Sequence, residues 1–255
     1  MIHRGVLPSP IIMVHGYFSS NKIGPHRLYY QIAEALNRVG YTVFRTDLSG
    51  MGESDGNIES IRFADHSSDL QAIVRHVLHR DDLCRSGCVH LIGHCIGCCT
   101  ALDVARIFPD NLESITLLSP FIPSKENHIK MLGDKNYEKI METGYGYRKG
   151  AYCCRSFICA AYILTNMVTT NLLRSVRTNI IFSQKDEFSN IDDSIGWSNS
   201  IPLSSHIIDN ANHNYIGSVV RTNLIELLLD IFQLWRLRPL RSRRSCAGLS
   251  SCPPL

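Results

Sequence analysis

The sequence predicts an α/β fold with a doubly wound, mostly parallel sheet and a helical cap inserted into it. Two observations carry this prediction. Short apolar, β-branched segments alternate with amphipathic helical stretches along most of the chain, and the alternation breaks only once, over residues 124–175. A strand that is followed by a helix and then by another strand gives parallel neighbours with helices on both faces of the sheet. With 255 residues, of which 44% are hydrophobic, the chain is long enough for one sizeable core.

Each element is predicted from its own pattern. Runs of Val, Ile and other apolar residues, bounded by polar or turn residues, predict strands over residues 10–15, 41–47, 88–93, 112–119, 178–183 and 203–209. Apolar residues three or four positions apart predict helices over residues 28–39, 70–77, 96–108 and 220–231. Gly40 is placed to end the first helix. The glycine-rich residues 48–57 predict a loop.

The segment 124–175 begins polar and rich in lysine, then turns apolar over residues 151–164. Two or three helices laid over the carboxyl edge of the sheet would account for it. The apolar part is too short to span a bilayer, and no other run is long enough. It is interpreted either as local packing or as the roof of a substrate pocket. We expect one domain over residues 1–238 that carries this insertion.

The net charge of +3 comes from a short C-terminal stretch. Without Arg236, Arg238, Arg241, Arg243 and Arg244 the charge would be −2, so the domain itself is not basic. Residues 239–255, rich in Arg, Ser and Pro, predict a disordered tail. A solubilising role for the tail is favoured over contact with nucleic acid or an anionic membrane, and we expect no nucleic-acid partner.

The ten cysteines include the adjacent pairs Cys98-Cys99 and Cys153-Cys154 in apolar segments. This arrangement favours reduced thiols and a cytoplasmic location over a disulfide scaffold. The first core strand starts so early in the sequence that we expect no cleaved signal peptide. The oligomeric state is left open.

The pentapeptide Gly93-His94-Cys95-Ile96-Gly97 follows a predicted strand and opens a predicted helix. This context is typical of a nucleophile elbow, in which the central side chain is exposed at the tip of a strained turn. Here the central residue is a cysteine, whose thiolate is favoured by a helix N-terminus and a nearby imidazole. Cys95 is therefore the candidate nucleophile.

In such elbows the acid and the base follow the nucleophile along the chain, and the acid orients the base. Asp186 and His213 lie just past two successive predicted strands in the required order, which makes them the candidate acid and base. Glu187 and Asp192 are alternatives to Asp186 but come later after the strand end.

Together these residues resemble the α/β-hydrolase fold superfamily over about residues 10–235. Residues 10–17, which contain His15-Gly16-Tyr17, resemble its oxyanion strand, and residues 46–54 resemble its Asp-x-x-Gly-x-Gly-x-Ser loop. The resemblance implies an acyl-enzyme mechanism in which the backbone N–H groups of Tyr17 and Ile96 hold the oxyanion. The cysteine elbow is similar to those of dienelactone hydrolases and polyhydroxyalkanoate synthases. The chain departs from the superfamily's pattern in its cysteine nucleophile and in lacking most of the N-terminal β-hairpin.

The sequence therefore predicts a hydrolase of small acyl esters or thioesters, including carrier-bound or coenzyme A thioesters, with no cofactor and no metal. Acyl transfer or cyclisation by the same acyl-enzyme is one alternative, and an inactive binding module is another. Cys95-x-x-Cys98 also matches a redox pair, but Cys98 belongs to a helical stripe that points into the core. His76 and His79 with nearby acids match no familiar zinc spacing. His15 and His94 are interpreted as supporting residues.

Overall fold

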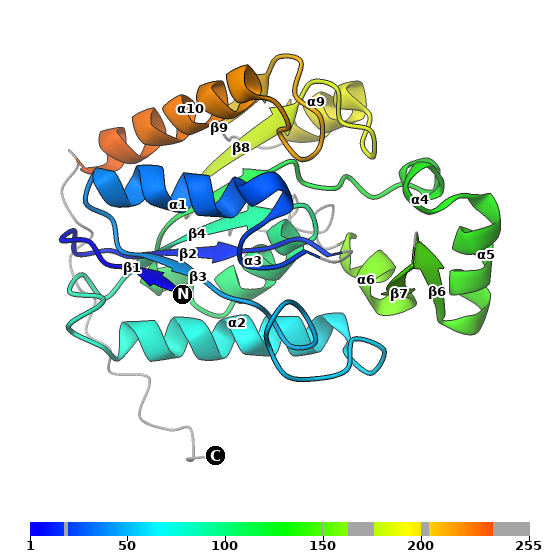
Figure 1. The fold of residues 1–255 in the computed structure, drawn as a ribbon, viewed down its shortest axis with the longest axis horizontal. Helices are drawn as coiled ribbons and strands as arrows, with labels where there is room; N and C mark the ends of the chain where they lie inside the picture. Colours follow the sequence, from blue (N-terminus) through cyan, green and yellow to red (C-terminus); the bar gives the residue numbers. More distant parts are fainter. Residues whose placement is uncertain (18–19, 149, 163–175, 200–203, 237–255) are drawn as a thin grey trace.

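The computed structural model describes residues 1–17, 20–148, 150–162, 176–199 and 204–236. Its centre is a seven-stranded sheet in the order β1-β3-β2-β4-β5-β8-β9, in which every pairing except that of β1 with β3 is parallel (Figure 1). The predicted doubly wound, mostly parallel sheet is confirmed. The strands are β1 (Ile2–His3), β2 (Ile11–Val14), β3 (Val43–Arg45), β4 (Val89–His94), β5 (Leu112–Leu118), β8 (Arg177–Ser183) and β9 (Ser204–Ile208).

Helices cover both faces of this sheet (Figure 1). α1 (Leu28–Arg38) and α10 (Ser218–Arg236) pack together on one face, and α2 (Phe63–Leu78) and α3 (Gly97–Ala105) pack on the other. Successive side chains of a strand point to opposite faces. Ile11 accordingly joins the core beneath α1 and α10, whereas Ile12 joins the core beneath α2 and α3.

The order of the strands reverses between β2 and β4, because β3 lies on one side of β2 and β4 on the other. In open α/β sheets, ligands bind in the crevice beyond the carboxyl ends of the strands at such a switch point. The residues that follow β2 and β4 are therefore placed at the position where this architecture most readily forms a site.

All six predicted strands and all four predicted helices are present, with ends shifted by up to seven residues, the largest shift being the start of α2 at Phe63. The sequence patterns missed β1 and α9 (Ile191–Asn199), and they missed the short 3-10 turns η1 (Pro25–Arg27) and η2 (Pro109–Asn111). β1 is too short to show a period, and it exists only through its pairing with β3.

The insertion lies beyond the carboxyl edge of the sheet, at the right of Figure 1, and will be called the cap. Its described part, residues 125–148 and 150–162, contains α4 (Lys125–Leu132), α5 (Asp134–Thr143), β6 (Tyr145–Arg148), β7 (Ala151–Cys154) and α6 (Arg155–Ala160). The sequence predicts helices alone, so the β6–β7 hairpin is a difference. It forms because Tyr145–Arg148 pairs antiparallel with Ala151–Cys154, a contact that helical periodicity cannot reveal. Residues 163–175 and the predicted tail, residues 239–255, lie outside the described residues.

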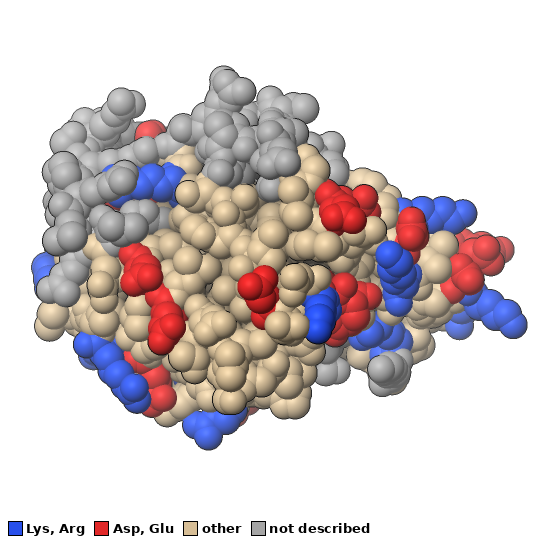
Figure 2. Space-filling model, turned by 90° about the horizontal axis from the view of Figure 1, so that it is seen from above, with Lys and Arg blue, Asp and Glu red and all other residues tan. Residues whose placement is uncertain are grey.

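Acidic and basic side chains are interspersed on the face shown in Figure 2, and they are densest over the cap at its right-hand end. Within the cap, Lys130 and Glu126 pair at 3.4 Å on α4. Mixed charge of this kind on the visible face differs from the single-sign surface that a polyanion requires. In the part of the chain that the structure describes, none of the helices is both long and apolar enough to cross a membrane.

Candidate active site

Cys95 lies at the tip of a sharp turn between β4 and α3. Its φ of +56° is in the left-handed region, which costs a residue other than glycine about 1–3 kcal/mol. The backbone N–H of Cys95 donates to the carbonyl of Leu118 at 3.0 Å and helps to hold this turn. The side chain is partly exposed, unlike the buried Cys98 and Cys99 that follow it. The turn therefore presents the thiol above the switch point of the sheet.

The two glycines of the elbow allow strand and helix to approach each other closely. A Cβ atom on Gly93 would lie 2.6 Å from the carbonyl oxygen of Gly97, and one on Gly97 would lie 2.5 Å from that of His15. Backbone atoms cannot yield as a flexible side chain can, so larger residues would push α3 away from β2 and β4. The G-x-Cys-x-G spacing thus reflects a real steric demand.

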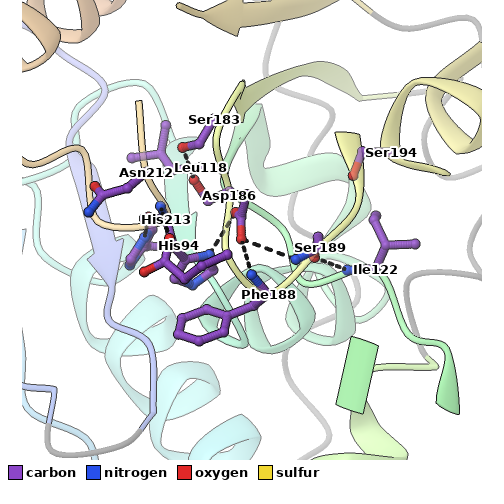
Figure 3. Close-up of polar contacts among 12 residues, drawn as sticks. His94, Leu118, Ile122, Ser183, Asp186, Phe188, Ser189, Ser194, Asn212 and His213 are labelled. Atoms are coloured by element: carbon purple, nitrogen blue, oxygen red, sulfur yellow. Dashed lines mark hydrogen bonds and ion pairs between the residues drawn. The ribbon is translucent and has the colours of Figure 1, made fainter. Parts of the chain in front are cut away.

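His213 and Asp186 follow the neighbouring strands β9 and β8, and their side chains meet. Nδ1 of His213 donates to Oδ2 of Asp186 at 2.7 Å, and both side chains are almost fully buried. Oδ1 of Asp186 accepts the backbone N–H groups of Phe188 at 2.9 Å and Ser189 at 3.1 Å (Figure 3). This Asx turn fixes the carboxylate in the orientation that holds the imidazole.

The loops that carry these two residues are bonded to each other. The N–H of Lys185 donates to the carbonyl of Ala211 at 2.7 Å, and the N–H of His213 donates to Oε2 of Glu187 at 2.9 Å. Glu187, a sequence alternative for the acid, therefore contacts the backbone of His213 rather than its ring. Asp192, the other alternative, lies at the start of α9, where its N–H bonds the side chain of Asn190.

The electrostatics of His213 depend on both candidate partners. Burial lowers the pKa of the His213 imidazole, but its interactions with Cys95 and Asp186 outweigh burial and raise that pKa well above its usual value. Nε2 of His213 is buried and makes no hydrogen bond of normal geometry to the described residues. The structure thus brings Cys95, His213 and Asp186 together, and Asp186 holds Nδ1 of the His213 ring.

The turn after β2 passes directly beside Cys95, since a Cβ on Gly16 would lie 3.2 Å from that of Cys95. His15 holds the turn: its Nε2 accepts the N–H of Leu48 at 3.0 Å, so its Nδ1 donates to the carbonyl of Gly16 at 2.7 Å. Burial lowers the pKa of His15 to about 4, which keeps the ring neutral. The N–H of Gly16 donates to Tyr29 Oη at 3.2 Å.

With the Gly16 N–H engaged, the next N–H along this turn is that of Tyr17. The N–H of Ile96 belongs to the first turn of the elbow helix, where backbone donors are not used within the helix. Both sequence-predicted oxyanion donors thus come from backbone segments that flank Cys95. Tyr17 and Ile96 also line a common cavity with Cys95.

The family described as alpha/beta hydrolase fold matches residues 9–155, more than half of the chain. The protein belongs to this family. Among solved structures, alpha/beta hydrolase domain-containing protein 10 from mouse superposes with a TM-score of 0.70 at 17% identity, covering 92% of this chain and 93% of that one. Est1E from Butyrivibrio proteoclasticus, solved with ferulic acid bound, gives 0.69 at 21% identity over 88% and 90% of the two chains. These two likenesses concern the fold.

Curated proteins resemble this α/β-hydrolase over a shorter stretch. A triacylglycerol lipase of Pseudomonas fragi is 30% identical over 126 residues, which are 49% of this chain and 37% of the lipase. The probable lysophospholipase BODYGUARD 1 of Arabidopsis thaliana is 29% identical over 111 residues, which are 43% of this chain and 22% of that protein. The chain thus spans well under half the length of either relative.

The sequence predicts only a supporting role for His94 and none for Tyr29, yet in this α/β-hydrolase both bond to backbone segments that carry the candidate site. His94 Nε2 lies 2.9 Å from the carbonyl oxygen of His213, which can only accept, so Nε2 carries the proton. Nδ1 then accepts from Tyr29 Oη at 2.8 Å. Burial lowers the pKa of His94 to about 3, consistent with a neutral ring. The histidine before the elbow cysteine was the available signal, but its partners are 65 and 119 residues away.

Cys95 and His213 line a cavity of about 200 Å³, whose walls also include Asn21, Pro25 and Asn214. Met131 and Arg148 of the cap also line it. The guanidinium of Arg148 lies 4.9 Å from the centre of the Phe188 ring. The Phe188 ring in turn meets that of His213 edge-on at 4.8 Å. The described cap therefore forms part of the wall of the site.

The cap is anchored to the turn that bears the predicted oxyanion donor. Phe157 of α6 stacks on Tyr17 with ring centres 4.0 Å apart, a contact typically worth about 0.5–1.5 kcal/mol. Phe157 also meets His66 of α2 with ring centres 5.0 Å apart, and Ser156 accepts the N–H of Phe63 at 3.3 Å.

Among the described residues, no group of three or more His, Cys, Asp or Glu side chains could hold a metal ion.

Proposed function

We propose that this α/β-hydrolase cleaves small acyl esters or thioesters through an acyl-cysteine intermediate, with Cys95 as nucleophile, His213 as base and Asp186 as its orienting acid. The observation that carries the proposal is the strained Cys95 turn beside a buried histidine whose other nitrogen bonds a carboxylate. Nucleophile, base and orienting group in this arrangement are the components of covalent acyl transfer.

In the first half of the reaction, Nε2 of His213 takes the proton of the Cys95 thiol, the sulfur bonds the acyl carbon, and the carbonyl electrons move to the oxygen. Tyr17 and Ile96 N–H groups donate to that oxygen. The carbon–leaving-group bond then breaks, and Nε2 of His213 gives its proton to the departing alcohol or thiol. In the second half, water attacks the thioester and loses its proton to His213. The bond to sulfur breaks, which releases the acid and restores the Cys95–His213 pair.

The relatives named as lipase and lysophospholipases support ester chemistry for this chain, although each alignment covers only part of those proteins. The thioester preference and the likeness to dienelactone hydrolases rest on Cys95 alone. A thiolate is a better leaving group than an alkoxide, so activated substrates such as thioesters, enol lactones and aryl esters should react faster than alkyl esters.

We place this activity in the cytoplasm. The eight cysteines in the described part of the chain are free thiols, which suits a reducing compartment. We also propose that the domain ends at residue 238 and that residues 239–255 are not needed for catalysis. Truncation before Pro239 should preserve both turnover and melting temperature.

The test is a mass-spectrometric time course with one thioester substrate in plain buffer. An acyl group that forms on Cys95 and then disappears supports hydrolysis. An adduct that clears only after an amine, alcohol or thiol is added would make the protein an acyltransferase. Binding of ligands without any adduct from any acyl donor would make it an inactive binding module.

A further inference from the structure

Cys95 lines two cavities of different size and character, and Tyr17 and Met131 line both as well. The first is the cavity of about 200 Å³ shared with His213 and Asn214. The second has only about 20 Å³ and lies on the Ile96 side, where its walls are mainly apolar cap and strand-end side chains. Its described lining does not include His213. These walls include Phe121, Met131, Phe157, Ile158 and Ala161.

The geometry of a tetrahedral intermediate assigns a role to each cavity. The reacting carbon carries four groups: the Cys95 sulfur, the oxyanion, the leaving group and the remainder of the acyl chain. The oxyanion must face the Ile96 and Tyr17 N–H groups, and the leaving group must face Nε2 of His213 to receive its proton. The leaving group therefore occupies the larger cavity, and the acyl chain is directed into the smaller one.

The smaller cavity, as its described residues define it, has room for only a few atoms of an acyl chain. About 20 Å³ of this kind of volume corresponds to roughly one or two water-sized groups. Three of its described wall residues are also tightly packed: Phe121, Phe157 and Ile158 are at most 4% exposed, and Phe157 contacts both Tyr17 and His66. Since packed interiors resist expansion, a long chain requires displacement of several of these side chains.

We propose that the protein is selective for short acyl groups, of about two or three carbons, attached to a larger and more polar alcohol or thiol. This inference rests on the proposed function and adds the class of substrate to it. The polar groups of Asn21, Asn214 and Arg148 line the leaving-group cavity, which suits an alcohol or thiol that carries hydrogen-bonding groups. The selectivity differs from what the name triacylglycerol lipase would suggest for a relative of this chain.

The experiment compares p-nitrophenyl acetate, butyrate and octanoate in the full chain, with both kcat/KM and acyl-Cys95 formation as readouts. An extra methylene in an apolar pocket typically changes kcat/KM by about tenfold or more. We expect octanoate to react at least about a hundredfold more slowly than acetate, and acetyl-Cys95 to form faster than octanoyl-Cys95.

Ile158→Ala enlarges the small cavity and should raise kcat/KM for butyrate relative to acetate by about tenfold. Leu132→Ala is the matched control, because Leu132 is a buried cap residue that lines neither cavity. The control should keep the wild-type chain-length profile even if it lowers the melting temperature.

Octanoate that acylates Cys95 as fast as acetate would overturn the chain-length selectivity and leave the acyl-cysteine mechanism standing. Equal shifts in Ile158→Ala and Leu132→Ala would also overturn it, since the small cavity would then not control the preference. Absence of an adduct on Cys95 with every ester would overturn the proposed function itself, and the selectivity with it.

Discussion

His94 Nε2 donates to the backbone carbonyl of His213 at 2.9 Å, so the residue before the candidate nucleophile holds the loop of the candidate base. Tyr29 extends this connection, because its hydroxyl donates to His94 at 2.8 Å and accepts the N–H of Gly16 at 3.2 Å. The neutral His94 ring and the Tyr29 phenol thereby link the turn beside Cys95 with the loop after β9 that carries His213.

His94→Ala should lower kcat by about 10–100-fold with little change in KM, because small errors in the placement of a base are costly. His94→Gln, which keeps a donor and an acceptor, should recover part of the loss. The rate of Cys95 alkylation, measured at temperatures well below each melting point, checks whether the imidazole has moved. If both variants alkylated at the wild-type rate, His94 would have only a packing role.

Cys95→Ala should reduce turnover by about three or more orders of magnitude, because the covalent route is lost. Iodoacetamide should label Cys95 before Cys159, an exposed cysteine of the cap that provides a control for accessibility. The thiolate is the reactive form, and an adjacent imidazolium stabilises it. Peptide mapping of partially labelled protein measures the order, and faster labelling at Cys159 would contradict the assignment.

Asp186→Asn should reduce kcat by about 10⁴-fold with the fold intact, by analogy with serine triads in which the orienting carboxylate was replaced. Glu187→Gln is its matched control. A glutamine oxygen can still accept the N–H of His213, so its effect should stay below about tenfold. Steady-state kinetics of the two variants decide between the two carboxylates, and the reverse ranking would make Glu187 the acid.

The charge on His213 should make stability depend on pH. Its pKa is raised in the folded protein, so the protonated ring contributes stability below the usual value of 6.5, and this contribution is lost as pH rises through the raised value. The difference in free energy of unfolding between the wild type and Asp186→Asn should therefore be larger at about pH 6 than at about pH 9. Urea unfolding at the two pH values measures it, and a difference that grows with pH would show that His213 is not protonated.

The sequence by itself determined the strand–helix alternation and the candidate residues Cys95, Asp186 and His213. These signals are local: apolar periodicity specifies each element, and the spacing of Gly93 and Gly97 reports a close contact within one turn. Parallel strands place their following loops at one edge of the sheet, so residues far apart in sequence could be expected together.

Only the tertiary structure decided what depends on contacts between distant segments. The β6–β7 hairpin, the contact of Glu187 with the His213 backbone, and the Tyr29–His94–His213 connection arise from pairings that no local pattern encodes. The same holds for the small cavity beside Cys95, whose volume depends on how cap side chains such as Phe157 pack against Tyr17. Packing is a property of the assembled core. The sequence therefore predicts the chemistry of this site but not the shape of the cavity that would hold its substrate.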